Sequence, residues 1–330
     1  MSPSRSCLPA TLLCCLYWLP LSGCGGTPKR VETPMTEAER EEYLQRQKIP
    51  SNLGRIDHRP TLFLTLDQNL RSWRTLAATA TTENQQERES FEAALTRLVY
   101  NNFDAILTEL DSGDPEFRIT AAAALGFSKI PAPDEPGGNP DFPPIHGRAL
   151  DPLRKALDEG DDRLTRNALL ALALISTPDS GVDPQIFLEM IVGHHDEDIR
   201  ANAAMALSKI LTPANTTAAL PVLYAALDDS SAKVRLHAVN GLIALNEKSS
   251  LGRLLLSYDT DSSPHVQANA ARALGLLGDR KAIPALIRGL TSKYSIIRVS
   301  TYLSLRRIVG EDLGHKPEPW QKWVDKNLKS

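Results

Sequence analysis

Three stretches in the middle of the chain share one pattern: Arg118-Ile-Thr-Ala-Ala-Ala-Ala-Leu125, Arg200-Ala-Asn-Ala-Ala-Met-Ala-Leu207 and Arg235-Leu-His-Ala-Val-Asn-Gly-Leu242. Each begins with arginine, has small residues three and six positions later, and reaches leucine at the seventh. Small residues and leucine at this spacing lie on one face of a helix. Self-similarity of this kind is typical of a repeat architecture, which is built by stacking one supersecondary unit.

Three further copies keep the leucine but change other positions, and they begin at Thr165, Gln267 and Arg298. Successive copies lie 47, 35, 35, 32 and 31 residues apart. The longest step contains residues 131–147, whose six prolines and three glycines cannot continue a helix. Without these 17 residues that step is 30, so residues 131–147 are predicted to be a loop insertion at one edge of the stack.

Each unit reads as a helical hairpin, in which an apolar helix and an acidic turn precede the alanine-rich helix. One hairpin cannot bury its own apolar face, so neighbouring hairpins must stack. The sequence therefore predicts an all-α fold, a right-handed α-α superhelix of about six helical hairpins over residues 101–310. Residues 61–100 are expected to form an N-terminal helical lead-in. Residues 311–330 are expected to form a C-terminal cap that contains Trp320 and Trp323.

The recurring arginines Arg118, Arg200, Arg235 and Arg298 lie close behind the acidic turns. Carboxylates in such turns can cap the following helix, and they also lie within reach of an arginine in the same or an adjacent unit. We expect a ladder of ion pairs between units, because charges at a fixed repeat position usually serve the packing of the repeat itself. Direct binding of a ligand by these arginines is the alternative.

The closing residues offer a second pair of candidates. Trp320 and Trp323 are one helical turn apart and follow Pro317 and Pro319. Together they can cover the last apolar face of the stack. The alternative is an exposed anchor for a partner, since tryptophan is favoured at binding hot spots.

Composition and motifs argue against several classes of function. The formal net charge of −3 provides no positive field to gather phosphates, so no nucleic-acid partner is expected. A nucleophile constellation, a phosphate-binding glycine loop and a dinucleotide fingerprint are all missing from the sequence. The dense cluster His194-His195-Asp196-Glu197-Asp198 is interpreted as a solvated capping turn rather than a metal site. We expect no catalytic residues, no metal and no cofactor, and hence not an enzyme.

The Phe-Arg, Ile-Arg and Val-Arg turns, followed by Ala-Ala-x-Ala-Leu helices, resemble HEAT repeats, particularly the short subtype shared with phycobilin lyases. This resemblance implies a scaffold that binds a protein or peptide on its concave surface. None of the seven histidines is followed by glutamate, so the His-Glu dyads of the HEAT-type di-iron hydroxylases are absent. A carrier or lyase for a tetrapyrrole-like ligand and a purely structural spacer of the cell envelope remain as alternatives.

The N-terminus carries a second resemblance. Leu21-Ser22-Gly23-Cys24 resembles the bacterial lipobox, which implies that residues 1–23 are a lipoprotein signal peptide and that Cys24 is lipidated. The polar, proline-interrupted residues that follow, up to residue 60, are expected to form a tether. The ending of the chain also looks like that of HEAT-containing bacterial lipoproteins. We therefore expect a membrane-anchored protein of the bacterial cell envelope, facing the periplasm or the exterior, whose partner is an envelope protein or peptide.

Overall fold

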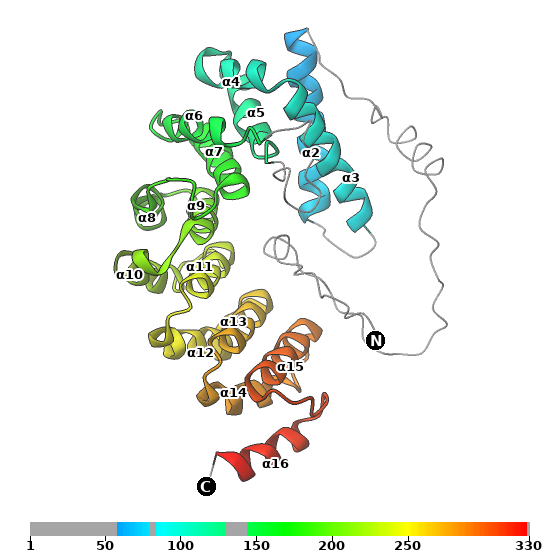
Figure 1. Ribbon diagram of the computed structural model, residues 1–330, viewed down its shortest axis with the longest axis vertical. Coiled ribbons are helices and arrows are strands. Elements are labelled where there is room, and N and C mark those ends of the chain that lie inside the picture. The colour runs from blue at the N-terminus through cyan, green and yellow to red at the C-terminus, as the bar shows by residue number, and fades with distance from the viewer. Residues whose placement is uncertain (1–57, 79–83, 130–143, 329–330) are drawn as a thin grey trace, which may run out of the picture.

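The structure, a computed structural model, describes residues 58–78, 84–129 and 144–328, and in these ranges its regular elements are helices joined by turns and loops (Figure 1). Residues 1–23, Cys24, most of the expected tether and residues 131–143 of the expected insertion lie outside the described residues. None of the described helices combines the length and apolar character needed to cross a bilayer.

In the described ranges, six helical hairpins stack side by side, as the repeat period predicts. The first helices of the pairs form the outer row: α4 (Phe103–Ser112), α6 (Gly147–Leu157), α8 (Pro184–Gly193), α10 (Thr216–Ala226), α12 (Leu251–Thr260) and α14 (Ile283–Gly289). The second helices form the inner row: α5 (Pro115–Leu125), α7 (Asp162–Ile175), α9 (Glu197–Ile210), α11 (Ala232–Leu245), α13 (Pro264–Leu277) and α15 (Ser295–Val309). The stack curves so that the inner row lies on its concave side (Figure 1).

Small residues let neighbouring inner helices approach closely. The repeated alanines on these helices are buried, and the repeat leucines Leu125, Leu172, Leu207, Leu242, Leu274 and Leu305 are completely inaccessible. One such close approach is at Gly275 of α13, where an added Cβ would lie 2.8 Å from the Cα of Ser304 on α15. Alanine and glycine therefore set the distance between units, and leucine fills the space between them.

Several of the acidic turn residues are helix caps, as expected. Asp114, Asp161 and Asp196 each accept a hydrogen bond from a backbone N–H in the first turn of the inner helix that follows. Other acids of the turns, such as Asp228 and Asp259, instead pair with arginines of the outer helices. The turns thus use carboxylates in two ways, and only the first follows directly from helix capping.

The N-terminal lead-in consists of α2 (Arg59–Ala78) and α3 (Gln85–Asn101). These helices do more than extend the stack, because α2 packs against the inner helix α5 as well as against α3 (Figure 1). The ring of Phe63 stacks on that of Phe117 with centroids 5.1 Å apart. At the start of α2, Arg59 donates two hydrogen bonds to the buried carboxylate of Glu109 on α4. Apolar packing and this ion pair together hold α2 across the concave side of the first repeats.

The last helix, α16 (Pro317–Asn327), contacts α14. Trp320 is completely buried, and its indole N–H donates to the carbonyl oxygen of Gly314 at 2.7 Å. A completely buried indole cannot be an exposed anchor for a partner, so only the capping role fits Trp320. Trp323 is partly exposed and packs beside Arg280.

Candidate binding surface

The repeat arginines bind carboxylates of the following unit. Nε and Nη2 of Arg200 donate to the two carboxylate oxygens of Asp229 at 2.8 and 3.0 Å. The same two groups of Arg235 donate to Asp261 at 2.7 and 2.9 Å. The pKa of Asp229 is lowered. Burial is the largest single influence and acts to raise this pKa, but the hydrogen bonds that the carboxylate accepts, led by those from Arg200, outweigh burial. These are the inter-unit pairs that the sequence predicts.

The same arginines also hold the turn of their own unit. Nη1 of Arg200 donates to the carbonyl oxygens five and six residues earlier, and Arg235 and Arg298 repeat this arrangement. Arg118 differs from Arg200 and Arg235 because it pairs with Glu159 rather than with an aspartate. Arg298 has no carboxylate partner among the described residues. The prediction of an inter-unit ion pair is therefore wrong for Arg298, which lies in α15 of the last described hairpin.

A polar ladder runs along the inner helices beside these arginines. Asn167, Asn202 and Asn269 occupy the same repeat position, two residues after the first. Each donates its side-chain N–H to a backbone carbonyl of the preceding inner helix, at 3.0 to 3.2 Å. His237 takes this position in the fourth repeat, where burial first, and then Lys209 and Lys233, lower its pKa to about 4. The three asparagines tie adjacent units together on the concave side.

The histidine cluster contains one residue that the sequence did not indicate. Nε2 of His194 and Nε2 of His195 lie 3.5 and 3.2 Å from the carboxylate of Asp162, which belongs to the preceding unit. However, Nδ1 of His194 accepts the backbone N–H of Asp196 at 3.1 Å. A neutral ring with its Nδ1 lone pair used in this way carries its proton on Nε2 and cannot offer that nitrogen to a metal. The geometry therefore fits a hydrogen-bonded turn better than a metal site.

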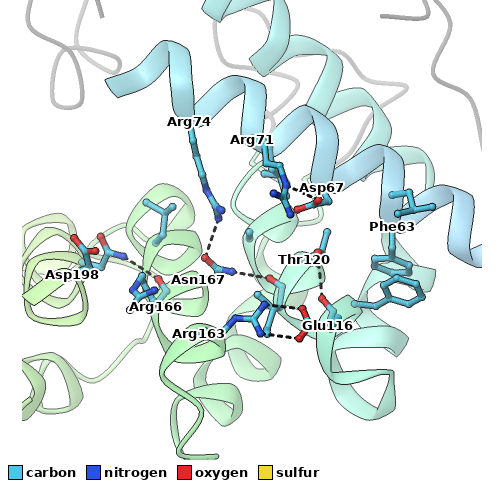
Figure 2. Close-up of a pocket in the computed structure, with 17 residues that line it drawn as sticks. Phe63, Asp67, Arg71, Arg74, Glu116, Thr120, Arg163, Arg166, Asn167 and Asp198 are labelled. Carbon is cyan, nitrogen blue, oxygen red and sulfur yellow. Dashed lines mark hydrogen bonds and ion pairs between the residues drawn. The ribbon is translucent and has the colours of Figure 1, made fainter. Parts of the chain in front are cut away.

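A pocket of about 580 Å³ opens between α2 and the inner helices α5, α7 and α9 (Figure 2). It is lined by the second and fifth residues after the repeat's first position, which are Thr120 and Ala123 in the first repeat and Asn167 and Leu170 in the second. These positions therefore mark the surface that faces the concave side. The roof is the polar edge of α2. Its charged lining includes Asp67, Arg71 and Arg74 from α2, and Glu116, Arg163 and Arg166 from α5 and α7.

Most charges around the pocket are already paired. Arg71 pairs with Asp67 within α2, and Arg163 forms two hydrogen bonds to Glu116, at 2.7 and 2.8 Å (Figure 2). Arg166 pairs with Asp196, which lies in the turn before α9. Of the arginines in the lining, only Arg74 takes no part in these ion pairs.

Arg74 has a neutral partner only. Its Nη2 donates to the side-chain oxygen of Asn167 at 3.0 Å, and no carboxylate among the described residues pairs with it. The side chain is solvent-exposed, but the walls around it remove part of its hydration, which is the main reason that its pKa is lowered. Asp67 acts against this shift, and the positive charges of Arg71 and Arg166 add to it.

Sequence reasoning missed this pocket. The repeat period identifies the inner helices and their exposed positions, but nothing in α2 matches the repeat, so its position across them has no periodic signal. The one available hint was the helical spacing of apolar residues in residues 62–76, which indicates a helix with a buried face but does not say what covers that face.

Comparison with known families identifies the repeats. The family model for HEAT repeats matches residues 150–230 and 220–306. No curated protein matches the chain.

Several solved structures are similar to this chain at low identity. An engineered protein is 20% identical over 64% of this chain and 97% of its own, with a TM-score of 0.49. The complex of CpcE and CpcF of phycocyanin lyase from Nostoc sp. PCC7120 is 17% identical over 84% and 97%, with a TM-score of 0.40. A designed armadillo repeat protein in complex with the peptide (KR)4 is 17% identical over 74% and 99%, with a TM-score of 0.38.

Proposed function

Because this chain is a HEAT-repeat protein, we propose that it is a scaffold that binds an extended protein segment on its concave surface. The observation that carries the proposal is the pocket that α2 forms with the inner helices on that side. Extended concave surfaces are the binding surfaces that helical solenoids use. The role proposed is binding rather than catalysis, since the repeat arginines are occupied by carboxylates and backbone carbonyls of the stack itself.

The inner surface continues beyond the pocket. The fifth position after the repeat's first residue is Asn240 in α11 and Leu303 in α15, and Leu303 is 41% exposed. The same position lines the pocket in α5 and α7. A segment held in the pocket could therefore extend along the later repeats, in contact with side chains at this one position.

Site-specific photo-crosslinking in intact cells tests this proposal. A photoreactive phenylalanine analogue is placed at Asn240 or Leu303 on the inner helices. In matched controls it is placed at Val192 of α8 or Leu256 of α12, which are exposed on the outer row. We expect a discrete protein adduct from the inner positions only. Equal adducts from both rows, or lipid adducts alone, would contradict binding on the concave surface.

The membrane anchor is a separate part of the proposal. It is supported by the lipobox-like residues before Cys24, and it would place the scaffold at a bacterial envelope membrane, facing the periplasm or the exterior. Detergent phase partitioning of the whole chain and of the Cys24→Ala variant tests it, with mass spectrometry of the N-terminal peptide. We expect the unaltered chain in the detergent phase with an acylated cysteine, and the variant in the aqueous phase. An unmodified Cys24 would refute the anchor without affecting the binding proposal.

A further inference from the structure

We propose that the pocket beneath α2 binds an acidic side chain of the partner segment, with Arg74 as the residue that pairs with it. This inference rests on the proposed function, and it names the chemistry that the scaffold would recognise. The first argument is the balance of charge. The lining contains four arginines, Arg71, Arg74, Arg163 and Arg166, and three carboxylates, Asp67, Glu116 and Asp198.

Each of the three carboxylates already has a cation. Asp67 has Arg71, Glu116 has Arg163, and Asp198 accepts from Lys233 at 2.8 Å. The pocket therefore has no carboxylate to spare for a basic ligand. Among the cations of the lining, Arg74 is the one without a carboxylate partner. An acidic side chain of a partner could therefore pair with Arg74 without displacing a carboxylate from an existing ion pair.

The second argument is the geometry of Arg74. A guanidinium has five N–H donors in a planar fork, and the hydrogen bond from Arg74 to Asn167 uses one of them. The amide of Asn167 is fixed in turn, because its N–H donates to the carbonyl oxygen of Ile119 at 3.0 Å. Arg74 is thus oriented from one side while donors remain for a carboxylate. Figure 2 shows its side chain directed from α2 toward α7 across the pocket.

The third argument is electrostatic. Arg71 and Arg166 both repel the charge of Arg74, and the surrounding walls reduce its hydration. A bound carboxylate would relieve this repulsion and replace the lost hydration with charge-assisted hydrogen bonds. The pocket is therefore better suited to an anion than to a neutral group of the same size.

The apolar part of the lining indicates which type of residue lies beside the acidic residue in the bound segment. Leu64 of α2 is 65% exposed at the pocket, and Leu170 and Ile119 line the opposite wall. An exposed leucine beside a charged cleft favours a protein segment over a free anion, since only a segment brings an apolar side chain next to its carboxylate. The occupant that fits is an extended segment with glutamate or aspartate beside a leucine-like residue.

Fluorescence anisotropy with labelled peptides tests this inference on the purified chain. The probe is a short peptide in which glutamate alternates with leucine, and the matched peptides replace glutamate with glutamine or with lysine. We expect the acidic peptide to bind about tenfold more tightly than the glutamine peptide, because one charge-assisted bidentate pair is lost. The lysine peptide should bind most weakly.

Variants then assign the effect to Arg74. Arg74→Gln should abolish the preference for glutamate over glutamine, while Arg74→Lys should retain part of it because the charge remains without the fork. Arg307→Gln is the matched control, since Arg307 is an exposed arginine on α15 near the other end of the inner row. Thermal unfolding should be unchanged in these variants, because both arginines are exposed.

Three results would overturn the inference. The first is equal binding of the acidic and glutamine peptides. The second is equal weakening by Arg74→Gln and Arg307→Gln, which would show diffuse attraction over the whole concave side. The third is binding that appears only when Glu37, Glu39, Glu41 and Glu42 are replaced with glutamine, which would identify the chain's own acidic segment as the occupant. None of these results would remove inner-row crosslinks from Leu303, so failure of the inference is distinguishable from failure of the scaffold function.

Discussion

Replacing Arg235 with methionine should destabilise the stack much more than the same change at Arg163. Both arginines bind a carboxylate of another repeat through two hydrogen bonds. They differ in burial. The side chains of Arg235 and Asp261 are 11% and 5% exposed, whereas those of Arg163 and Glu116 are 57% and 67% exposed. Methionine keeps much of the aliphatic stem, so the comparison isolates the charged group.

The expected size follows from this difference in burial. Arg235→Met leaves the carboxylate of Asp261 buried without its cation, and one backbone N–H, that of Ser263, still donates to it. It also frees the carbonyls of Asp229 and Ser230. Breaking a buried pair on one side costs about 3–5 kcal/mol, and we expect about 3 because Ser263 still donates to the carboxylate. Arg163→Met removes an exposed pair, for which about 0.2–1 kcal/mol is expected.

Urea unfolding followed by circular dichroism gives the total change in stability. Because repeat stacks can unfold in segments, hydrogen exchange of α11 and α13 locates that change. The double variant Arg235→Met with Asp261→Asn should recover part of the loss, since the unpaired charge is removed. Similar losses from the two arginine variants, or a loss below about 1 kcal/mol for Arg235→Met, would refute the assignment of the ladder as a main source of inter-unit stability.

Three further predictions concern single positions. His237 stays neutral in the folded state to about pH 4, whereas an ordinary histidine takes up its proton near pH 6.5, so stability is complete above pH 6.5 and falls as the pH drops toward 4. Urea titrations should show a loss of about 1–2 kcal/mol between pH 7 and pH 5, which His237→Asn removes and the exposed-site control His265→Asn does not. Trp320→Ala empties a completely buried site and should lower the free energy of unfolding by about 3–5 kcal/mol. Hydrogen-exchange protection should be lost first in α16, and unchanged protection there would contradict the capping role. Gly275→Ala should lower the thermal midpoint by forcing α13 and α15 apart, whereas Gly252→Ala on α12, where no heavy atom lies near the added Cβ, should leave it unchanged or raise it; equal shifts would count against the close approach.

The repeats were predictable because each copy carries similar residue types at the same spacing within a short stretch of sequence. The small residues and the leucine of each copy fix which face of the inner helix is buried, and the structure buries that face. The first position also identified Arg200 and Arg235, whose partners belong to the next copy of the same unit. The period predicts these ion pairs because each unit repeats both the arginine and the acidic turn that supplies a carboxylate to the arginine of the preceding unit.

The same reasoning failed where the period breaks. Arg118 pairs with Glu159 across the first step, which contains the proline-rich insertion, so the aspartate of the regular spacing is not its partner. Asp162 joins His194 and His195 through a contact between units that no single turn encodes. The position of α2 depends on Arg59 and Phe63 meeting Glu109 and Phe117, which are long-range contacts without a repeated pattern.

If the proposed binding function is correct, the difference between the ladder and Arg74 indicates where the chain recognises its partner. Within the stack, Arg200 and Arg235 each pair with a carboxylate of the next unit, so their charge holds neighbouring units together. Arg74 comes from α2, which is not a repeat, and no carboxylate in the described part of the chain pairs with it. Its position over α7 nevertheless places it on the concave surface, beside a side chain of the repeated amide ladder. Arg74 thus carries a charge that no carboxylate of the described residues neutralises, and the amide ladder holds it in the pocket, so the proposed selective binding would depend on this residue.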